Sequence, residues 1–292
     1  MSETEINVDG VLLFASALYD IGLDEDACKF AGNYLPNLAQ FGINAENDIT
    51  KERIYNLVGR EADGSVKPEF RYMLHAKDDR IENAVFNIYY RGNNFATRES
   101  YDLLCKAATD GNADAYYYMG RMYLGSGYIP QCITFEYDLE KGEHYFNVSM
   151  QKGSALAMFA CRRLSGFEPE NGSFVNPPFD TQTEVFRAVY FNAIAGDVFY
   201  QYVLANAYYF DDVFELLDIP YTDYLANLSA RVALNLYEEQ LSAGYRMGEG
   251  NYIDILTSGD CGIKPDKKRI KRFGKKADKA RKIRFKQLRK SL

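Results

Sequence analysis

The sequence predicts an all-α protein, an α-solenoid built from repeated helix–glycine–helix units. Gly111, Gly153, Gly196 and Gly244 recur at intervals of 42 to 48 residues, and each lies between two stretches whose apolar residues follow the period of an α-helix. A glycine that ends one helix just before the next begins, at a near-constant interval, is typical of helical repeat proteins. The 24 Tyr and 19 Phe, with no Trp, suit thin helical layers, because a tyrosine ring packs while its hydroxyl reaches water.

Residues 1–62 are predicted to form a helical N-terminal cap. The apolar periodicity predicts helices over 8–20, 25–38 and 50–60, with Asp24 as N-cap of the second helix and Pro36 near its end. Terminal units of a repeat array differ from the rest because one side of each faces water. We therefore expect this part to close one end of the array.

Residues 67–258 are predicted to form the repeat array. Its first helix pair, over 69–77 and 80–90, has Asp78 and Asp79 at the junction where the later units have glycine. The four glycine units follow. The sequence therefore predicts four to five helix pairs, each joined by a short turn.

The connections between the glycine units are much longer than the junctions inside them and span 125–138, 166–181 and 211–223. In stacked helix pairs, connections of the same parity emerge at one edge, which is often the binding face. These three are both aromatic and acidic. We therefore expect a partner-binding surface at Phe135, Tyr137, Phe167, Phe174, Phe179, Phe214 and Tyr221.

The C-terminal tail, residues 264–292, differs sharply in charge from the rest of the chain. It carries fifteen Lys/Arg and two Asp, a net charge of +13, whereas residues 1–263 carry 19 basic and 39 acidic residues, a net charge of −20. Apolar residues at Ile270, Phe273, Ala277 and Ala280 recur at helical spacing, which predicts a basic amphipathic helix over about 266–290. We expect these four side chains to face the acidic body or a neighbouring subunit.

Four interpretations of the tail remain open. It could contact nucleic acid through phosphates, lie on an anionic membrane surface, bind its own acidic body or a second copy of the chain, or remain a disordered solubilising segment. The residues expected to contact a polyanion are Lys267, Lys268, Arg269, Lys271, Arg272, Lys275, Lys276, Arg281, Lys282 and Arg284.

The sequence contains no pattern that indicates catalysis. The two histidines, His75 and His144, are far apart and have no His, Cys or carboxylate neighbour at metal-ligand spacing, and the phosphate-binding and nucleophile motifs are missing. The acidic pairs lack the alternating ligand spacing of a calcium loop. We therefore expect no enzymatic activity, no cofactor and no metal site.

Targeting signals are also missing from the sequence. The N-terminus has no basic region before its short apolar run, and no stretch approaches the 18 apolar residues of a membrane span. The five cysteines are odd in number and scattered, as expected for reduced thiols. We expect a cytoplasmic protein.

The segment LLCKAATDGNADAYYYMGRMYLGSGY, residues 103–128, resembles the Sel-one-like repeat, a member of the tetratricopeptide-like superfamily. The resemblance rests on Ala107, Ala108, Gly111, Ala115, Gly120, Tyr123 and the glycines at 125 and 127. It extends over about two-thirds of the chain, with fewer matching positions in each later unit. It implies a right-handed superhelix of antiparallel helix pairs and a role as adaptor or scaffold, and it brings no catalytic residues.

These observations lead to two functional hypotheses. The first is a cytosolic, non-enzymatic scaffold that binds an unidentified protein partner through the aromatic and acidic edge. The alternative is a nucleic-acid-associated regulator whose basic tail contacts phosphates. Self-association through the tail is compatible with either.

Overall fold

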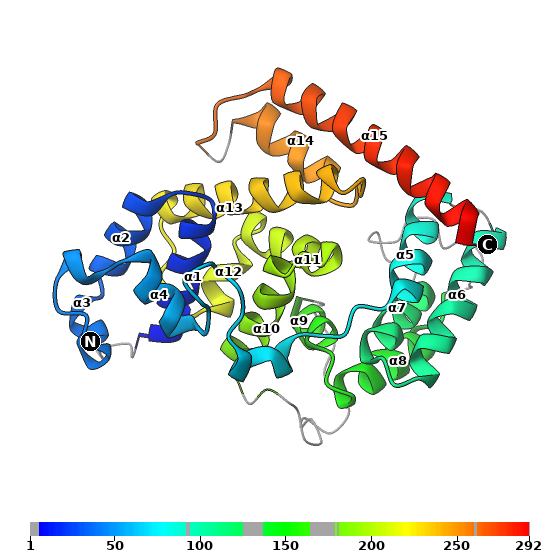
Figure 1. The fold of residues 1–292 in the computed structure, drawn as a ribbon, viewed down its shortest axis with the longest axis horizontal. Coiled ribbons are helices and arrows are strands. Elements are labelled where there is room, and N and C mark those ends of the chain that lie inside the picture. The colour runs from blue at the N-terminus through cyan, green and yellow to red at the C-terminus, as the bar shows by residue number, and fades with distance from the viewer. Residues whose placement is uncertain are drawn as a thin grey trace. The chain divides into compact units, whose positions relative to one another are not determined.

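The computed structural model describes residues 6–91, 94–124, 137–163, 179, 181–259 and 262–291. Within these ranges the chain forms α-helices and short 3-10 helices, with one isolated β-bridge between Arg60 and Val66 and no β-strand (Figure 1). The predicted all-α class is confirmed.

The chain forms two compact units. Unit 1 comprises Met1–Leu74 and Phe186–Gln287, and unit 2 comprises His75–Val185 and Leu288–Leu292. The N-terminal segment expected to cap the array thus belongs to the same unit as the last two glycine units. Unit 2 is inserted into unit 1 along the sequence.

All four helix–glycine–helix units are present. Each glycine has a φ between 89° and 95°, a left-handed conformation that glycine adopts without steric cost. At each junction the glycine N–H donates to the carbonyl three residues earlier, and the next N–H donates to the carbonyl five residues earlier, as in a Schellman cap. The pairs are α6 (Asn94–Thr109) with α7 (Ala113–Leu124), α8 (Leu139–Gln151) with α9 (Ala155–Arg163), α10 (Gln182–Ile194) with α11 (Val198–Tyr209), and α13 (Asp223–Ser242) with α14 (Glu249–Ser258).

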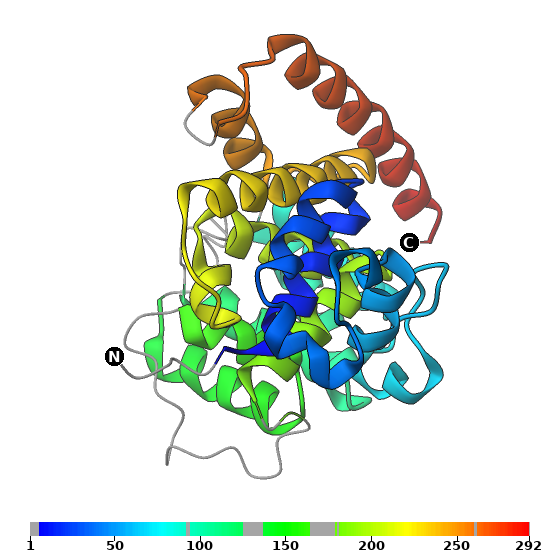
Figure 2. The same ribbon diagram turned by 90° about the vertical axis from the view of Figure 1, so that its left-hand side faces the viewer.

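Unit 1 is organised around α1 (Val8–Asp20). Residues 10–19 of this helix are all buried, as expected of a helix that is apolar on every side. It packs against α2 (Asp24–Gly32), α4 (Lys51–Val58) and α13, and Figure 2 shows it beside α13. The Phe14 ring contacts the rings of Phe30, Tyr208 and Phe214, so helices distant in sequence share one aromatic core.

Unit 2 contains α5 (Asp79–Arg91) through α9. Each helix packs against the next one along the chain: α5 on α6, α6 on α7, α7 on α8 and α8 on α9. Such sequential packing is the local arrangement expected of helical repeats.

The prediction of a single helix over 25–38 is wrong in one respect. This segment is divided into α2 and the short α3 (Leu35–Leu38), which is followed by the 3-10 helices η1 (Ala39–Phe41) and η2 (Glu46–Asp48). Pro36 stands in the first turn of α3. Proline has no N–H to donate and is tolerated only in the first turn of a helix, so the chain breaks before it.

Two other segments differ from expectation. The first helix of the predicted pair at 69–77 is instead the 3-10 helix η3 (Pro68–Met73), and the Met73 carbonyl accepts a hydrogen bond from the Asn192 side chain of α10 at 2.9 Å. The connection 211–223, expected to be a loop, contains α12 (Asp212–Leu216), whose Val213, Phe214 and Leu216 are buried.

Candidate functional site

The basic tail forms the long helix α15 (Lys267–Ser291), close to the predicted range (Figure 1). The Asp266 carboxylate accepts a hydrogen bond from the Arg269 backbone N–H at 2.8 Å, which satisfies one of the free donors of the first turn. The tail is therefore a defined helix, and its residues up to Gln287 belong to unit 1.

The apolar side of α15 packs against the α13–α14 hairpin. Ala277 is fully buried, and the Phe273 ring meets the Tyr252 ring of α14 edge-on, with centroids 6.0 Å apart. A Cβ atom at Gly244 would lie 2.8 Å from the backbone of α15 and 3.2 Å from the Ala280 side chain. The glycine junction of this hairpin thus accommodates the backbone of the tail helix.

Two ion pairs hold α15 in this position. The Arg269 Nε donates to Glu238 of α13 at 2.5 Å, and this bond raises the pKa of the arginine above its ordinary value. The Arg246 Nη2 donates to Asp278 at 2.8 Å. Only the first pair matches the expectation that the basic tail docks on acidic groups of the body; in the second, the body supplies the arginine and α15 the carboxylate.

The ten residues expected to contact a polyanion divide into two groups. Arg269, Arg281 and Arg284 are partly buried, and the last two lie near Asp278 and over the Tyr245 ring, respectively. The other seven are exposed on α15: Lys267, Lys268, Lys271, Arg272, Lys275, Lys276 and Lys282.

The exposed cations form one row along α15. They recur in pairs every fourth residue at 267/268, 271/272 and 275/276, and exposed lysines continue at 279, 282 and 286. Residues four apart lie on the same side of a helix, and 19 residues at 1.5 Å each span about 28 Å. This basic face lies opposite the docked apolar side.

The expected aromatic surface is represented only in part. Phe135, Phe167 and Phe174 lie outside the described residues. Tyr137 is 66% exposed and Tyr221 is 57% exposed, whereas Phe179 and Phe214 are buried. Phe214 packs on Phe14 and on Tyr221. Of the four rings that the structure describes, two therefore lie at the surface, one in each unit.

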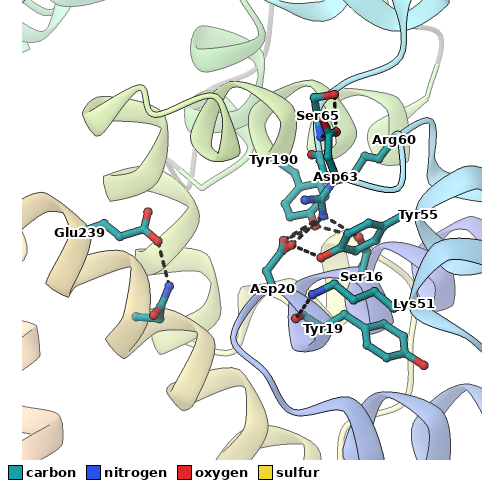
Figure 3. Close-up of polar contacts among 12 residues, drawn as sticks. Ser16, Tyr19, Asp20, Lys51, Tyr55, Arg60, Asp63, Ser65, Tyr190 and Glu239 are labelled. Atoms are coloured by element: carbon teal, nitrogen blue, oxygen red, sulfur yellow. Dashed lines mark hydrogen bonds and ion pairs between the residues drawn. The ribbon is translucent and has the colours of Figure 1, made fainter.

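Unit 1 also contains a buried polar cluster that the sequence does not indicate, centred on Asp20 and Arg60 (Figure 3). Arg60 Nη1 lies 2.8 Å from the Asp20 carboxylate and 3.0 Å from the Ser16 hydroxyl. The Tyr55 hydroxyl donates to Asp20 at 2.6 Å, and the Tyr190 hydroxyl of α10 donates to the same carboxylate. Three helices and the segment after α4 thus meet at one carboxylate.

Several contacts fix the position of the Arg60 side chain. Its guanidinium lies 3.9 Å from the centroid of the Tyr55 ring, and its Nε donates to the Gly64 carbonyl at 2.9 Å. Burial and the nearby Asp20 charge both raise the pKa of Tyr190 well above its ordinary value, so this hydroxyl stays protonated. The charges of Asp20 and Arg60 therefore cancel, and these contacts fix the positions of both side chains.

No local signal marks this cluster. Its hydrogen bonds join residues separated by 40, 130 and 170 positions. Asp20, Arg60 and Tyr190 belong to no shared motif, so only the tertiary fold brings them together.

The chain matches no protein-family model and no curated protein sequence. Among the described residues, no helix is long and apolar enough to cross a membrane.

Proposed function

We propose that this protein is a non-enzymatic, cytoplasmic interaction protein whose basic helix α15 binds nucleic acid through its phosphates. We also propose that its helix pairs stack as a right-handed solenoid of the Sel-one-like kind. Four identical glycine junctions and the sequential packing of α5 to α9 support the repeat architecture.

The observation that carries the binding proposal is the row of exposed cations on α15. A single DNA strand places one phosphate about every 3.4 Å along the duplex axis, so about 28 Å of helix faces roughly eight phosphates. The side chains of the row are long and exposed, although Arg272 and Lys276 also lie over the Phe273 ring, whereas the apolar side of the helix is already docked. Such contacts neutralise phosphates without reading bases, so we expect little sequence preference.

The test measures affinity for a fluorescent oligonucleotide as a function of salt. We compare Lys271→Glu/Lys275→Glu/Lys282→Glu with the control Lys77→Glu/Lys106→Glu/Lys152→Glu, which changes the net charge equally at exposed positions outside α15. Removing three phosphate contacts should reduce the slope of log K against log salt by about two to three, whereas the control should reduce it by less than one. Equal slopes for the two variants would show that α15 is not the contact surface.

A second candidate is a protein partner bound at the exposed rings of the long connections, Tyr137 and Tyr221. Tyrosine is enriched at interfaces because it adds a large contact area at low entropic cost. Tyr137→Ser and Tyr221→Ser should reduce capture of a native partner without changing the salt slope for oligonucleotides. Unchanged capture by both variants would remove this candidate.

A further inference from the structure

A cavity in unit 1 adjoins the Asp20–Arg60 cluster and has no part in the surfaces described above. Its volume is about 210 Å³. An engineered cavity of about 150 Å³ holds benzene, so this one accommodates a ligand of about ten non-hydrogen atoms. It is therefore large enough for a small organic molecule.

The floor of the cavity is buried and contains polar groups. Arg60 is 4% exposed, Tyr190 is 2% exposed and Tyr208 is fully buried. The first two are already bonded to one another and to Asp20. The Tyr208 hydroxyl has no hydrogen-bond partner among the described residues, but it has almost no accessible surface, so it lies behind the cavity wall and does not contact a ligand.

The more exposed end of the cavity is acidic. Glu239 of α13 accepts hydrogen bonds from Gln201 at 2.7 Å and Asn235 at 3.0 Å, but within the described ranges it forms no salt bridge. Figure 3 shows it on the opposite side of the site from Asp20 and Tyr190. Loss of solvation and the charge of Asp20 both raise the pKa of Glu239. A cation beside this carboxylate would stabilise its charged form and so oppose both effects.

The charges and the walls specify the kind of ligand. Arg60 neutralises Asp20, so Glu239 leaves the cavity with a net charge of −1, which disfavours an anion. Within the described residues no three His, Cys, Asp or Glu side chains come together as a metal site, so an organic cation suits the single uncompensated carboxylate of Glu239 better than a metal ion. The remaining wall is apolar, formed mainly by Ile194, Leu204, Val232 and Leu236.

We propose that this cavity binds a small organic amine. Its ammonium group pairs with Glu239, and its apolar body lies against the leucine and isoleucine side chains. The site is independent of α15, so it adds a small-molecule ligand to the proposed interaction function.

The test uses calorimetric titration of the full chain with four probes of similar size. Tyramine carries both the ammonium and the hydroxyl; tyrosol replaces the ammonium with a neutral hydroxyl; phenethylamine lacks the phenol hydroxyl; 4-hydroxyphenylacetate is an anion. Tyramine should bind about tenfold more tightly than tyrosol, phenethylamine should bind about as tightly as tyramine because both carry the ammonium group, and the anion should not bind.

One variant assigns this difference to a residue. Glu239→Gln should remove the preference for tyramine over tyrosol. Asp254→Asn, which removes an exposed carboxylate on α14, is the control and should leave the preference unchanged. A glutamine at position 239 keeps an oxygen that can accept the hydrogen bonds from Gln201 and Asn235, so the melting temperature should stay nearly unchanged and loss of binding would not reflect unfolding.

Three results would overturn the proposal. These are no heat of binding for either amine at millimolar concentration, equal affinity for tyramine and tyrosol in the unaltered protein, and an amine preference that survives in Glu239→Gln.

Discussion

Gly244 differs from the other junction glycines because it both adopts a left-handed backbone and touches another helix. A Cβ atom at Gly196 would meet no atom within 4 Å, whereas one at Gly244 would press on the backbone of α15. Alanine at either position should lower the free energy of unfolding by about 1–2 kcal/mol, because both have φ near +90°. Gly244→Ala alone should also loosen α15, seen as faster amide hydrogen exchange over 267–287. Equal exchange in the two variants would contradict the close contact.

Arg60 is expected to matter more for stability than any surface arginine. It is 4% exposed and bonds to Asp20, Ser16 and Tyr190, so removing it leaves the Asp20 carboxylate without its cation. Breaking a buried pair costs about 3–5 kcal/mol, and since the Asp20 side chain is 22% exposed we expect about 3 kcal/mol for Arg60→Met.

Arg80→Met is the control for that measurement. Arg80 pairs with Asp78 and Asp110 nearer the surface, where ion pairs contribute about 0–1 kcal/mol. Urea unfolding of the two variants measures the difference. Similar losses of unfolding free energy in the two variants would mean that burial of the Asp20–Arg60 pair adds little to stability.

At the scale of elements, the sequence predicts those features whose cause is local. The four junctions were predictable because a left-handed helix end favours glycine, and the tail helix because its apolar spacing is regular. The 3-10 helix η3, which replaces the helix predicted over 69–77, was not predictable, because the Met73 carbonyl is bonded to Asn192, more than one hundred residues away. The Asp20–Arg60 cluster and the cavity beside it escaped prediction for the same reason.

Docking of α15 depends on the small size of Ala277. This side chain is fully buried, about one turn from the edge-on contact of Phe273 and Tyr252. Ala277→Glu would bury a carboxylate, which is unfavourable without a partner, so we expect α15 to detach. Limited trypsin digestion should then cleave within 267–286 many times faster than in the unaltered protein.

Lys279→Glu is the matched control for Ala277→Glu, because it places the same side chain at an exposed position two residues away. It should leave the digestion rate of α15 nearly unchanged. If both variants are cleaved at the same rate, the net charge of the helix, and not the packing at Ala277, controls its docking.

For the whole molecule, the chain divides into two compact units. The glycine repeats predict an array over 67–258, and the packing joins residues 1–74 with 186–287 in one of the two units. The repeats predict how each helix pair turns, since that is encoded locally. They do not predict which pairs share a core, because the Phe14 contacts with Tyr208 and Phe214 join distant segments.

This organisation predicts that unit 1 folds without the insertion. The Met73 carbonyl bonds to Asn192, and Phe186 lies six residues earlier on α10, about 9 Å along the helix axis. An eight-residue Gly/Ser linker, with a typical end-to-end distance of about 15 Å, can therefore join Leu74 to Phe186 in place of residues 75–185. The shortened protein should be helical, unfold cooperatively on heating, and keep both the oligonucleotide affinity of α15 and the amine affinity of the cavity.

Residues 75–185 expressed alone provide the complementary measurement. They carry their own packed helices, α5 to α9, and should also be helical by circular dichroism, but they should bind neither probe because α15 and the cavity belong to unit 1. Aggregation of the shortened protein, or a helical signal that melts without cooperativity, would mean that the two segments of unit 1 need unit 2 to form their core. Both binding activities would then depend on the intact chain. The cavity is formed by residues on either side of the insertion, and α15 packs against residues of the same unit.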